Sequence, residues 1–206
     1  MRQAFEDEAV ATGRPRLLLT AAVGVGQGTV DWSYDVPALS DATDMINLMT
    51  YDLNGPWSPG TGLNSGLYPQ NGGDTLNVEW ASNYWIKKGA DRSKLMVGIP
   101  TYGHVMKLCD PANGQGMGSK TCGTGKEGRY TASPGFEAYY ESCLKLQCTE
   151  QNWTVHWNEK GQAPFMYKGD QWISYETQES IVKKVQWAKD NNFGGVMVWV
   201  SCFEIV

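Results

Sequence analysis

The chain of 206 residues lacks the features that define a membrane protein or a nucleic-acid-binding protein. It has no uninterrupted apolar run of about 18 residues, the length at which a hydrophobic stretch can cross a bilayer. Its net charge is −5, and its longest basic runs are the pairs Lys87-Lys88 and Lys183-Lys184. Phosphate backbones are bound by clustered Lys and Arg. We therefore expect partners other than membranes and nucleic acids.

Potential metal ligands are scarce as well. The chain has two histidines, His104 and His156, and the spacings of its five cysteines match no zinc-binding pattern. A closed zinc site needs a tetrahedral set of such ligands at short, regular spacings. We expect no metal ion and no organic cofactor.

The cysteines indicate an oxidising compartment, because five are more than an intracellular protein usually carries without a metal or catalytic use. They are Cys109, Cys122, Cys143, Cys148 and Cys202. We expect Cys109 and Cys122 to close a glycine-rich loop, and the odd count leaves at least one thiol unpaired or paired elsewhere. Residues 152–154 (Asn-Trp-Thr) form a glycosylation acceptor sequence. We expect an extracellular protein whose export signal is absent from this chain, because residues 1–8 are acidic and have no apolar centre.

Aromatic side chains are abundant, with nine Trp and ten Tyr. Large flat rings fill hydrophobic cores, and they also form the walls of carbohydrate-binding grooves. Composition alone does not separate these two uses. The position of each ring along the chain therefore has to decide which use applies.

Short apolar segments alternate with amphipathic ones along most of the chain. The apolar segments are typical of strands buried on both faces, and the alternation predicts parallel strands joined by right-handed helical crossovers. The predicted strands are Leu17–Val23, Met45–Tyr51, Leu95–Thr101 and Val196–Val200. The predicted helices are residues 2–12, ended by Gly13, Asp35–Ala42, Asn77–Lys88, capped by Asn77, and Gln178–Asn191.

The pattern changes after Tyr102. The following segment is rich in glycine and has short aromatic runs, with a helical candidate at Ser133–Leu146 and a hairpin at Phe165–Trp172 that turns at Gly169. We therefore interpret this segment as an α+β lobe inserted between β/α units. The predicted division is β/α units in residues 1–101, the inserted lobe in residues 102–172, and a last helix and strand in residues 173–206.

Polar and aromatic side chains stand where the predicted strands end. Tyr51 and Asp52 close the second strand. Tyr102 follows the third, and Trp199 lies in the fourth. Taken singly, Asp52 is an ordinary loop cap and Trp199 an ordinary core residue. Together these side chains favour a polar ligand, because α/β barrels carry their chemistry at the carboxyl ends of their strands. Trp57, in a Gly-Pro loop, is better placed to stack on a ring than to fill a core.

Several strings along the chain carry a family resemblance, and they occur in one register. They are residues 17–23 (Leu-Leu-Leu-Thr-Ala-Ala-Val), 47–52 (Asn-Leu-Met-Thr-Tyr-Asp), 98–103 (Gly-Ile-Pro-Thr-Tyr-Gly), 138–141 (Ala-Tyr-Tyr-Glu), 171–172 (Gln-Trp) and 194–199 (Gly-Gly-Val-Met-Val-Trp). In these strings the chain resembles the animal chitinases of glycoside hydrolase family 18. The resemblance extends from about Arg2 to Trp199.

The resemblance implies an activity and a set of roles. Members of this family cleave chitin, the β-1,4-linked polymer of N-acetylglucosamine, with retention, and the acetamido oxygen of the substrate is the nucleophile. Chitin or chitooligosaccharides are then the expected partners. Tyr51 is expected to hold the acetamide and Asp52 to bind the same sugar, both as ancillary catalytic residues. The resemblance also implies four substrate contacts. Met49 would line the pocket and Trp199 would lie beneath the distorted sugar. Trp57 and Tyr102 would contact sugars further along the oligosaccharide.

The departures from the family pattern are as informative. The family's general acid is a Glu that ends an Asp-x-x-Asp-x-Asp-x-Glu motif on the fourth strand, and this string is absent here. The first predicted strand resembles the family's fifth, and a complete barrel has about 250 residues. We therefore expect an incomplete (β/α)8 TIM barrel, made of the last four β/α units with the inserted α+β lobe. His104 stands where these enzymes commonly carry Arg, and residues 200–206 differ from the usual acidic tail.

Without that Glu, we expect this chain to be inactive in hydrolysis. Asp52 lies on the correct face but on a different strand, and nothing in the sequence places Glu204 near a glycosidic oxygen, which a general acid must approach to about 3 Å. Three interpretations stay open: a fragment or incomplete gene model of a secreted chitinase, a chitinase-like lectin that binds chitin oligosaccharides without cleavage, and a degenerate remnant without function.

Four parallel strands cannot close into a barrel. Their outer strands would expose unpaired backbone N–H and C=O groups, and the inner face, packed by other strands in a complete barrel, would be open. We expect this exposed half-barrel face to self-associate.

Overall fold

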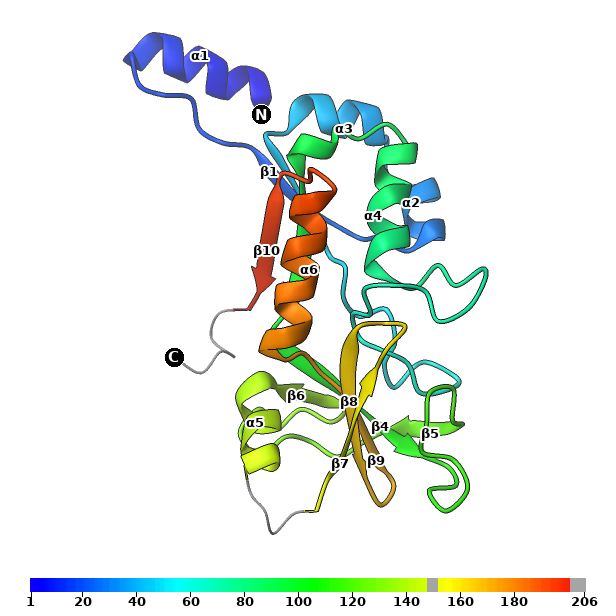
Figure 1. The fold of residues 1–206 in the computed structure, drawn as a ribbon. Helices are drawn as coiled ribbons and strands as arrows, with labels where there is room; N and C mark the ends of the chain where they lie inside the picture. Colours follow the sequence, from blue (N-terminus) through cyan, green and yellow to red (C-terminus); the bar gives the residue numbers. More distant parts are fainter. Residues whose placement is uncertain (148–151, 201–206) are drawn as a thin grey trace.

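The computed structural model describes residues 1–147 and 152–200, which form two β-sheets (Figure 1). The first sheet is parallel, in the order β1 (Thr20–Val23), β2 (Met45–Leu48), β3 (Leu95–Pro100) and β10 (Gly195–Trp199). The second sheet is antiparallel, in the order β5 (Thr121–Thr124), β4 (Tyr102–Leu108), β9 (Gln171–Ser174), β8 (Ala163–Lys168) and β7 (Thr154–Asn158), with β6 (Phe136–Ala138) paired to β4. The predicted alternation of parallel strands and helices is confirmed.

Helices α1 to α4 and α6 accompany the parallel strands. They are α1 (Arg2–Thr12), α2 (Gln27–Ser33), α3 (Val36–Ala42), α4 (Val78–Lys87) and α6 (Gln178–Asp190), with the short 3-10 helix η1 (Arg92–Lys94) before β3. The predicted cap of α4 is confirmed, because the Asn77 side chain accepts a hydrogen bond from the Trp80 backbone N–H at 2.8 Å. Gly13 ends α1 in the left-handed conformation, as predicted. The sequence does not predict α2, which contains the poor helix formers Gly28 and Thr29.

Helices α2, α3, α4 and α6 cover one face of the parallel sheet, whereas α1 lies away from it and buries no residue (Figure 1). Val23, Leu48 and Val97 form a row across neighbouring strands, are fully buried, and share a core with Trp85 of α4. The adjacent row points to the opposite face and is exposed or half-buried. It consists of Ala22, Asn47 and Met96. The sheet therefore has one helix-covered face and one face that is largely open in the part of the chain that the structure describes.

The first strand is shorter and more exposed than its apolar sequence predicts. It begins at Thr20, and Leu17 and Leu18 are 54% and 64% exposed. The prediction that this run is buried on both faces is wrong, because Ala22 points to the open face of the sheet and is exposed. In addition, β1 is an edge strand of the described sheet, so its outer side meets no further strand. The preceding segment is held instead by Asp44, whose carboxylate accepts hydrogen bonds from Arg16.

Apolar side chains of the second sheet form buried clusters separate from the core of the first sheet. Met106 and Trp172 are fully buried and belong to one cluster. Strands β8 and β9 form the predicted hairpin, and Gly169 at its turn has a φ of 56°.

The helix predicted over Ser133–Leu146 is only partly right. Phe136 pairs with His104 as part of β6, and Gly135 before it has a φ of 76° that a helix does not accommodate. Helix α5 therefore covers only Tyr139–Gln147.

The predicted disulfide between Cys109 and Cys122 is present, with its Cα atoms 5.0 Å apart. It joins the end of β4 to β5. Cys143 is half-buried and unpaired in the part of the chain that the structure describes, whereas Cys148 and Cys202 lie outside that part. Within residues 1–147 and 152–200, no helix has both the length and the apolar character needed to cross a bilayer.

Candidate functional site

A cluster of polar side chains lies at the carboxyl edge of the parallel sheet. Asp52, which follows β2, accepts two hydrogen bonds on the same oxygen. The Tyr102 hydroxyl donates to Oδ1 over 2.6 Å, and His104 Nε2 lies 2.8 Å from the same atom. We call these three side chains the Asp52 cluster. Tyr102 and His104 reach it together because residues two apart on a strand point to the same face.

The backbone around the cluster is shaped by local constraints. Asp52 has a φ of 58°, in the left-handed region that Asp tolerates better than most residues. Gly98 on β3 leaves room for the neighbouring ring: a Cβ there would lie 2.9 Å from Cε1 of Tyr51 and 2.3 Å from the Leu48 carbonyl oxygen. The Thr50 hydroxyl donates to the Gly98 carbonyl oxygen over 2.8 Å and fixes the end of β2 against β3.

Asn64 supports the cluster and is missed by the sequence reasoning. It is fully buried, and its Oδ1 accepts a hydrogen bond from the Asp52 backbone N–H at 2.8 Å. Its Nδ2 donates to the Tyr102 carbonyl oxygen at 3.2 Å, and its backbone N–H donates to Ser174 Oγ at 2.7 Å. Asn64 therefore connects the end of β2 to the second sheet, to β4 through its side chain and to β9 through its backbone N–H. Its only signal in the sequence is a turn-forming Asn-Ser-Gly string, which is too common to indicate a site.

The surroundings set the charges of the cluster. Burial disfavours ionisation of Asp52, but hydrogen bonds from His104 and Tyr102 outweigh it, and the pKa of this carboxyl is lowered. Burial, with a smaller contribution from Asp52, raises the pKa of Tyr51 to about 12. Burial and the hydrogen bond to Asp52 likewise raise the pKa of Tyr102. Near neutral pH the ionised carboxylate of Asp52 therefore lies beside the protonated phenols of Tyr102, within the cluster, and Tyr51, next to it.

Aromatic rings surround the carboxylate. Tyr51 meets Tyr102 edge to face at 6.0 Å between centroids, and Tyr102 stacks on Phe136 at 4.8 Å. Trp57 lies edge to face with His104 at 4.9 Å and is 61% exposed. The exposure of Trp57 agrees with the prediction that it is not a core residue.

Two predicted site residues lie on the same sheet edge without joining the Asp52 cluster. Trp199 ends β10 and is 54% exposed, and its carbonyl oxygen accepts a hydrogen bond from the Thr101 backbone N–H at 2.9 Å. Met49 follows β2, is half-buried, and donates its backbone N–H to the Val23 carbonyl oxygen. Among the described residues, neither side chain has a hydrogen bond or ring contact with the Asp52 cluster.

Other acidic side chains serve the scaffold. The buried carboxylates of Glu137 and Glu176 are paired with Lys145 and Lys184. Glu204, considered above as a proton donor, lies outside the described residues. In the described ranges, no group of three or more His, Cys, Asp or Glu side chains is arranged to hold a metal ion.

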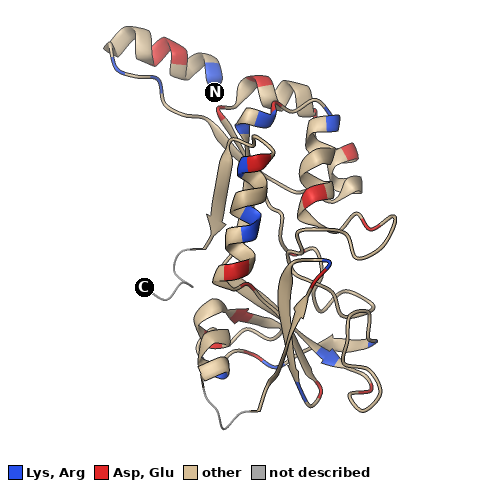
Figure 2. Ribbon diagram, in the orientation of Figure 1, with Lys and Arg blue, Asp and Glu red and all other residues tan. Residues whose placement is uncertain are grey.

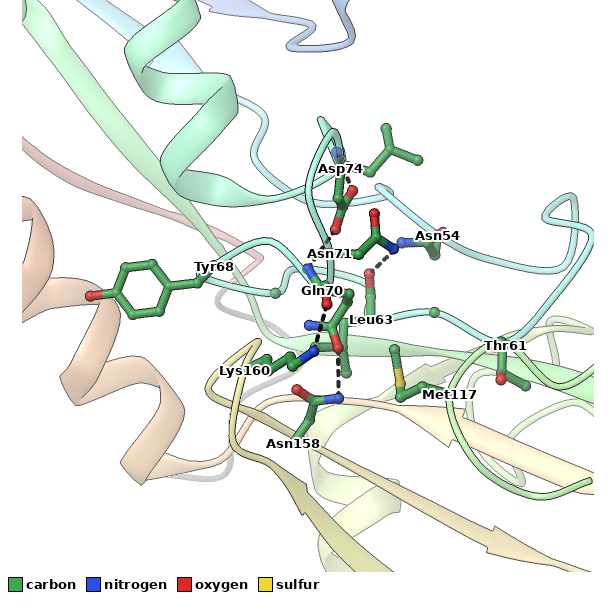
Figure 3. A pocket seen from close by; sticks show the side chains of 14 residues that line it. Asn54, Thr61, Leu63, Tyr68, Gln70, Asn71, Asp74, Met117, Asn158 and Lys160 are labelled. Carbon is green, nitrogen blue, oxygen red and sulfur yellow. Dashed lines mark hydrogen bonds between the residues drawn. The ribbon is translucent and has the colours of Figure 1, made fainter.

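A separate hollow of about 450 Å³ lies between the loop that follows Asn54, the β7–β8 turn and residues 117–118 (Figure 3). Several polar groups that line it form hydrogen bonds with one another. Gln70 accepts a hydrogen bond from Asn158 on its side chain and one from Lys160 on its carbonyl oxygen. Its lining includes none of the predicted site residues. We therefore keep it apart from the candidate site.

Parallel strands joined by helices, with polar and aromatic side chains at their carboxyl edge, are features of the α/β-barrel class. The comparison with known families is more specific, because the glycosyl hydrolases family 18 matches residues 1–203. The chain belongs to this family.

Relatives in the comparison include an enzyme and a protein described as a pseudo-enzyme. The endochitinase of Brugia malayi is 36% identical over 99% of this chain and 40% of its own length. The oviduct-specific glycoprotein of Mesocricetus auratus is 40% identical over 95% of this chain and 28% of its own length. Human YKL-39, described as a pseudo-chitinase with retained chitooligosaccharide binding properties, superimposes with a TM-score of 0.92 and 37% identity, over 98% of this chain and 56% of that chain. The present chain thus spans about half or less of the length of these relatives.

Proposed function

We propose that this chain binds chitin oligosaccharides at the carboxyl edge of its parallel sheet and does not hydrolyse them. The observation that carries this proposal is the Asp52 cluster, in which two donors fix one carboxylate beside an exposed ring, Trp57. Carboxylates bind sugar hydroxyls and exposed rings stack on sugar faces, and this combination is typical of carbohydrate sites.

The residues take complementary roles in this proposal. Tyr51 donates its hydroxyl to the acetamide of a bound N-acetylglucosamine, because its raised pKa keeps it protonated. Both protein donors reach Oδ1 of Asp52, so Oδ2 is available to a sugar hydroxyl. Apolar walls and stacking surfaces complete the site. They are Met49, Trp57 and Trp199. The ring of Tyr102 is buried and stacked on Phe136, so Tyr102 contributes to the site through its hydrogen bond to Asp52.

The absence of hydrolysis follows from the requirements of general acid catalysis. The acid must carry a proton and lie near the glycosidic oxygen. The lowered pKa of Asp52 keeps its carboxyl ionised near neutral pH, so it is a poor proton donor. These 206 residues contain no Asp-x-x-Asp-x-Asp-x-Glu string that could supply another acid.

A second candidate function is chitin hydrolysis by a longer protein that supplies the acid on another strand. It is favoured by the likeness to the endochitinase, which this chain matches over 40% of that relative's length. In this candidate, and in the first, the parallel strands correspond to the last four β/α units of a (β/α)8 barrel. Residues 102–172 form the inserted lobe. In the first candidate, the exposed half-barrel face is the surface on which copies of the chain associate, whereas in the second candidate the additional strands cover this face.

We also propose that the protein is extracellular. The disulfide between Cys109 and Cys122 supports this, because such bonds persist mainly in oxidising compartments.

Calorimetric titration of the chain with the hexamer of N-acetylglucosamine tests the binding function. We expect Tyr51→Phe to weaken binding about fivefold and Asp52→Ala about tenfold, the effects of losing a neutral and a charged hydrogen bond. The matched control is Tyr130→Phe, which removes a hydroxyl from an exposed ring outside the site and is expected to leave binding unchanged. An unmodified chain that binds no hexamer contradicts the proposal.

Release of a fluorophore from a chitobiose glycoside tests the absence of hydrolysis. We expect no release above background from the unmodified chain. Turnover that disappears in Asp52→Ala would contradict the proposal that this chain does not hydrolyse chitin oligosaccharides.

A further inference from the structure

Both ring nitrogens of His104 face oxygen atoms that accept hydrogen bonds. Nε2 lies 2.8 Å from Asp52 Oδ1, and Nδ1 lies 3.2 Å from the backbone carbonyl oxygen of Gly135. A carbonyl oxygen and an ionised carboxylate have no proton to donate. Both contacts are therefore hydrogen bonds at the same time only in the imidazolium form of His104, in which each ring nitrogen carries a proton.

Uncharged side chains form most of the surroundings of this ring. The ring centroid lies 5.7 Å from that of Tyr102 on the same strand and 6.3 Å from that of Phe136 on β6. The loop after β2 contributes Trp57 at 4.9 Å. On β9, the residue paired with His104 is Ser174.

The titratable groups near the ring are Asp52, Tyr51, Tyr102 and Glu137. The two phenols stay neutral, because burial raises their pKa. Glu137 pairs with Gly103, one residue away from His104, so its side chain points to the other face of the sheet, where Ser142 and Lys145 donate to it. Asp52 is thus the one carboxylate in contact with the His104 ring in the described chain.

We propose that protonated His104 is a positioning residue that holds Asp52 and Trp57 for N-acetylglucosamine oligomers, and that loss of one of its two ring protons weakens their binding. This inference rests on the proposed sugar-binding function. Histidine is the side chain that ordinarily changes its charge between about pH 5 and pH 8. When one ring nitrogen loses its proton, its lone pair faces an oxygen lone pair, and either Asp52 or Gly135 loses a donor.

The direction of the effect follows from the other members of the Asp52 cluster. The lowered pKa of Asp52 keeps its carboxylate ionised across this range. The protonation of His104 can therefore change while Asp52 stays a hydrogen-bond acceptor. Protonated His104 orients Oδ1 and leaves Oδ2 to the sugar. A protonated imidazole also attracts the indole of Trp57 more strongly than a neutral one does. Binding is therefore expected to be tighter at the acidic end of the range.

Calorimetric titration of the chain with the hexamer of N-acetylglucosamine, near pH 5.5 and near pH 8, measures this effect. We expect affinity to be about tenfold weaker near pH 8, the scale of one hydrogen bond to a charged group. His104→Arg keeps both a charge and several donors at every pH and is expected to change less than about twofold. His104→Gln is neutral throughout and is expected to bind weakly at both pH values.

The other histidine supplies the control. His156 stacks on Phe165 and Tyr167, away from the Asp52 cluster, so His156→Gln is expected to keep the pH dependence of the unmodified chain. In His156→Gln the one remaining imidazole is that of His104. Its ring nitrogen NMR shifts report the titration without any change at the site, and their midpoint is expected to coincide with the midpoint of the affinity change.

The outcomes separate this inference from the function on which it rests. Equal affinity at both pH values overturns the inference and leaves sugar binding intact. A ring titration more than about one pH unit away from the affinity change also overturns it. An unmodified chain that binds no hexamer at either pH contradicts the proposed function itself.

Discussion

The two sheets of this protein bury their strands to different degrees. All four residues of β9 are buried in the antiparallel sheet. In the parallel sheet, the edge strand β10 leaves Val196, Val198 and Trp199 exposed, and it carries no charged residue (Figure 2). Charged residues and Pro are the usual protection of an edge strand. The central strands of the antiparallel sheet are therefore covered within the described chain, although Val155 on its edge strand β7 is exposed. The parallel sheet presents a longer apolar edge at β10, with three exposed apolar residues.

This difference explains where the candidate site gets its support. Tyr51 and Asp52 follow a strand of the parallel sheet, but the side chains that hold Asp52 come from β4 of the antiparallel sheet. Asn64 adds a further connection between the two. The position of Asp52 is thus fixed by side chains of the antiparallel sheet, whose central strands are already buried within the described chain.

The largest effect is expected at the edge of the open sheet. We expect the unmodified chain to associate in multi-angle light scattering and Val198→Lys to shift it towards the monomer, because a charge on an edge strand opposes pairing between copies. Val155→Lys is the matched control, since Val155 is similarly exposed on β7, the edge of the antiparallel sheet. A monodisperse, cooperatively melting monomer of the unmodified chain contradicts the comparison.

The next largest effect is expected from the disulfide of the antiparallel sheet. Replacing Cys109 and Cys122 by Ser opens a link that spans a sequence separation of 13. We expect a loss of about 3 kcal/mol in the free energy of unfolding, the scale for a loop of this length. Hydrogen exchange should accelerate in β4 and β5 and stay unchanged in β1 and β2. Equal acceleration in both sheets would mean that they unfold as one unit.

A smaller effect is expected at the connection between the sheets. Asn64→Ala leaves the Asp52 N–H and the Tyr102 carbonyl without their partner, which is expected to cost about 2 kcal/mol in unfolding free energy and to weaken hexamer binding. Asn71→Ala, at an exposed position in the same loop, is expected to stay within about 0.5 kcal/mol. Denaturant unfolding measures both. Matching losses in the two variants would argue against a special role for Asn64.

The smallest effect is expected at the outer side of β1, in acid. Hydrogen bonds from Arg16, the Leu19 N–H and Arg2 outweigh partial burial and hold the pKa of Asp44 well below its ordinary value of 3.8. A carboxyl with a lowered pKa stabilises the fold above its ordinary pKa, and this contribution disappears as the pH falls from 3.8 through the lowered value. We expect the segment before β1 to loosen in that range.

Asp44→Asn is expected to loosen the same segment already at neutral pH. Faster trypsin cleavage after Arg16, which Asp44 holds in the unmodified chain, measures the change. Asp41→Asn, on the exposed side of α3, serves as the control. Unchanged cleavage in Asp44→Asn would show that α1 is held by other contacts.

Local elements are the part of the fold that can be predicted from the sequence. The Asn77 cap, the Gly13 stop and the Gly169 turn each depend on the chemistry of a few adjacent residues, and each is confirmed. The Cys109–Cys122 pair is also local enough to infer. By contrast, α2 is missed because its propensity is poor and its formation depends on packing of the buried Val30.

Predictions that required knowledge of neighbours are less accurate. The exposure of Leu17 and Leu18 depends on whether another strand covers them, which an apolar run does not reveal. The first part of the helix predicted over Ser133–Leu146 is a strand, because Phe136 finds a partner on β4. Pairing between segments far apart in sequence decides both cases.

The candidate site likewise contains residues that the sequence predicts and residues that only the structure reveals. The strand-end pattern brings Asp52 and Tyr102 together as expected, but Trp199 lies outside the Asp52 cluster. The sequence indicates no role for His104 at this site beyond its departure from the family pattern, although its alternation with Tyr102 places it on the same face of the strand. Asn64 has no comparable signal, because it acts through three contacts with residues 12 to 110 positions away.

Sequence by itself determined the order of helices and strands, the family, and the residues that stand at the carboxyl ends of the parallel strands, since these depend on periodicity, turn chemistry and short strings. Only the tertiary structure decided that the carboxylate of Asp52 is shared between a phenol and an imidazole. Hydrogen bonds between side chains depend on distances of a few tenths of an ångström. Such distances are set by strand register and by a buried amide from a distant loop.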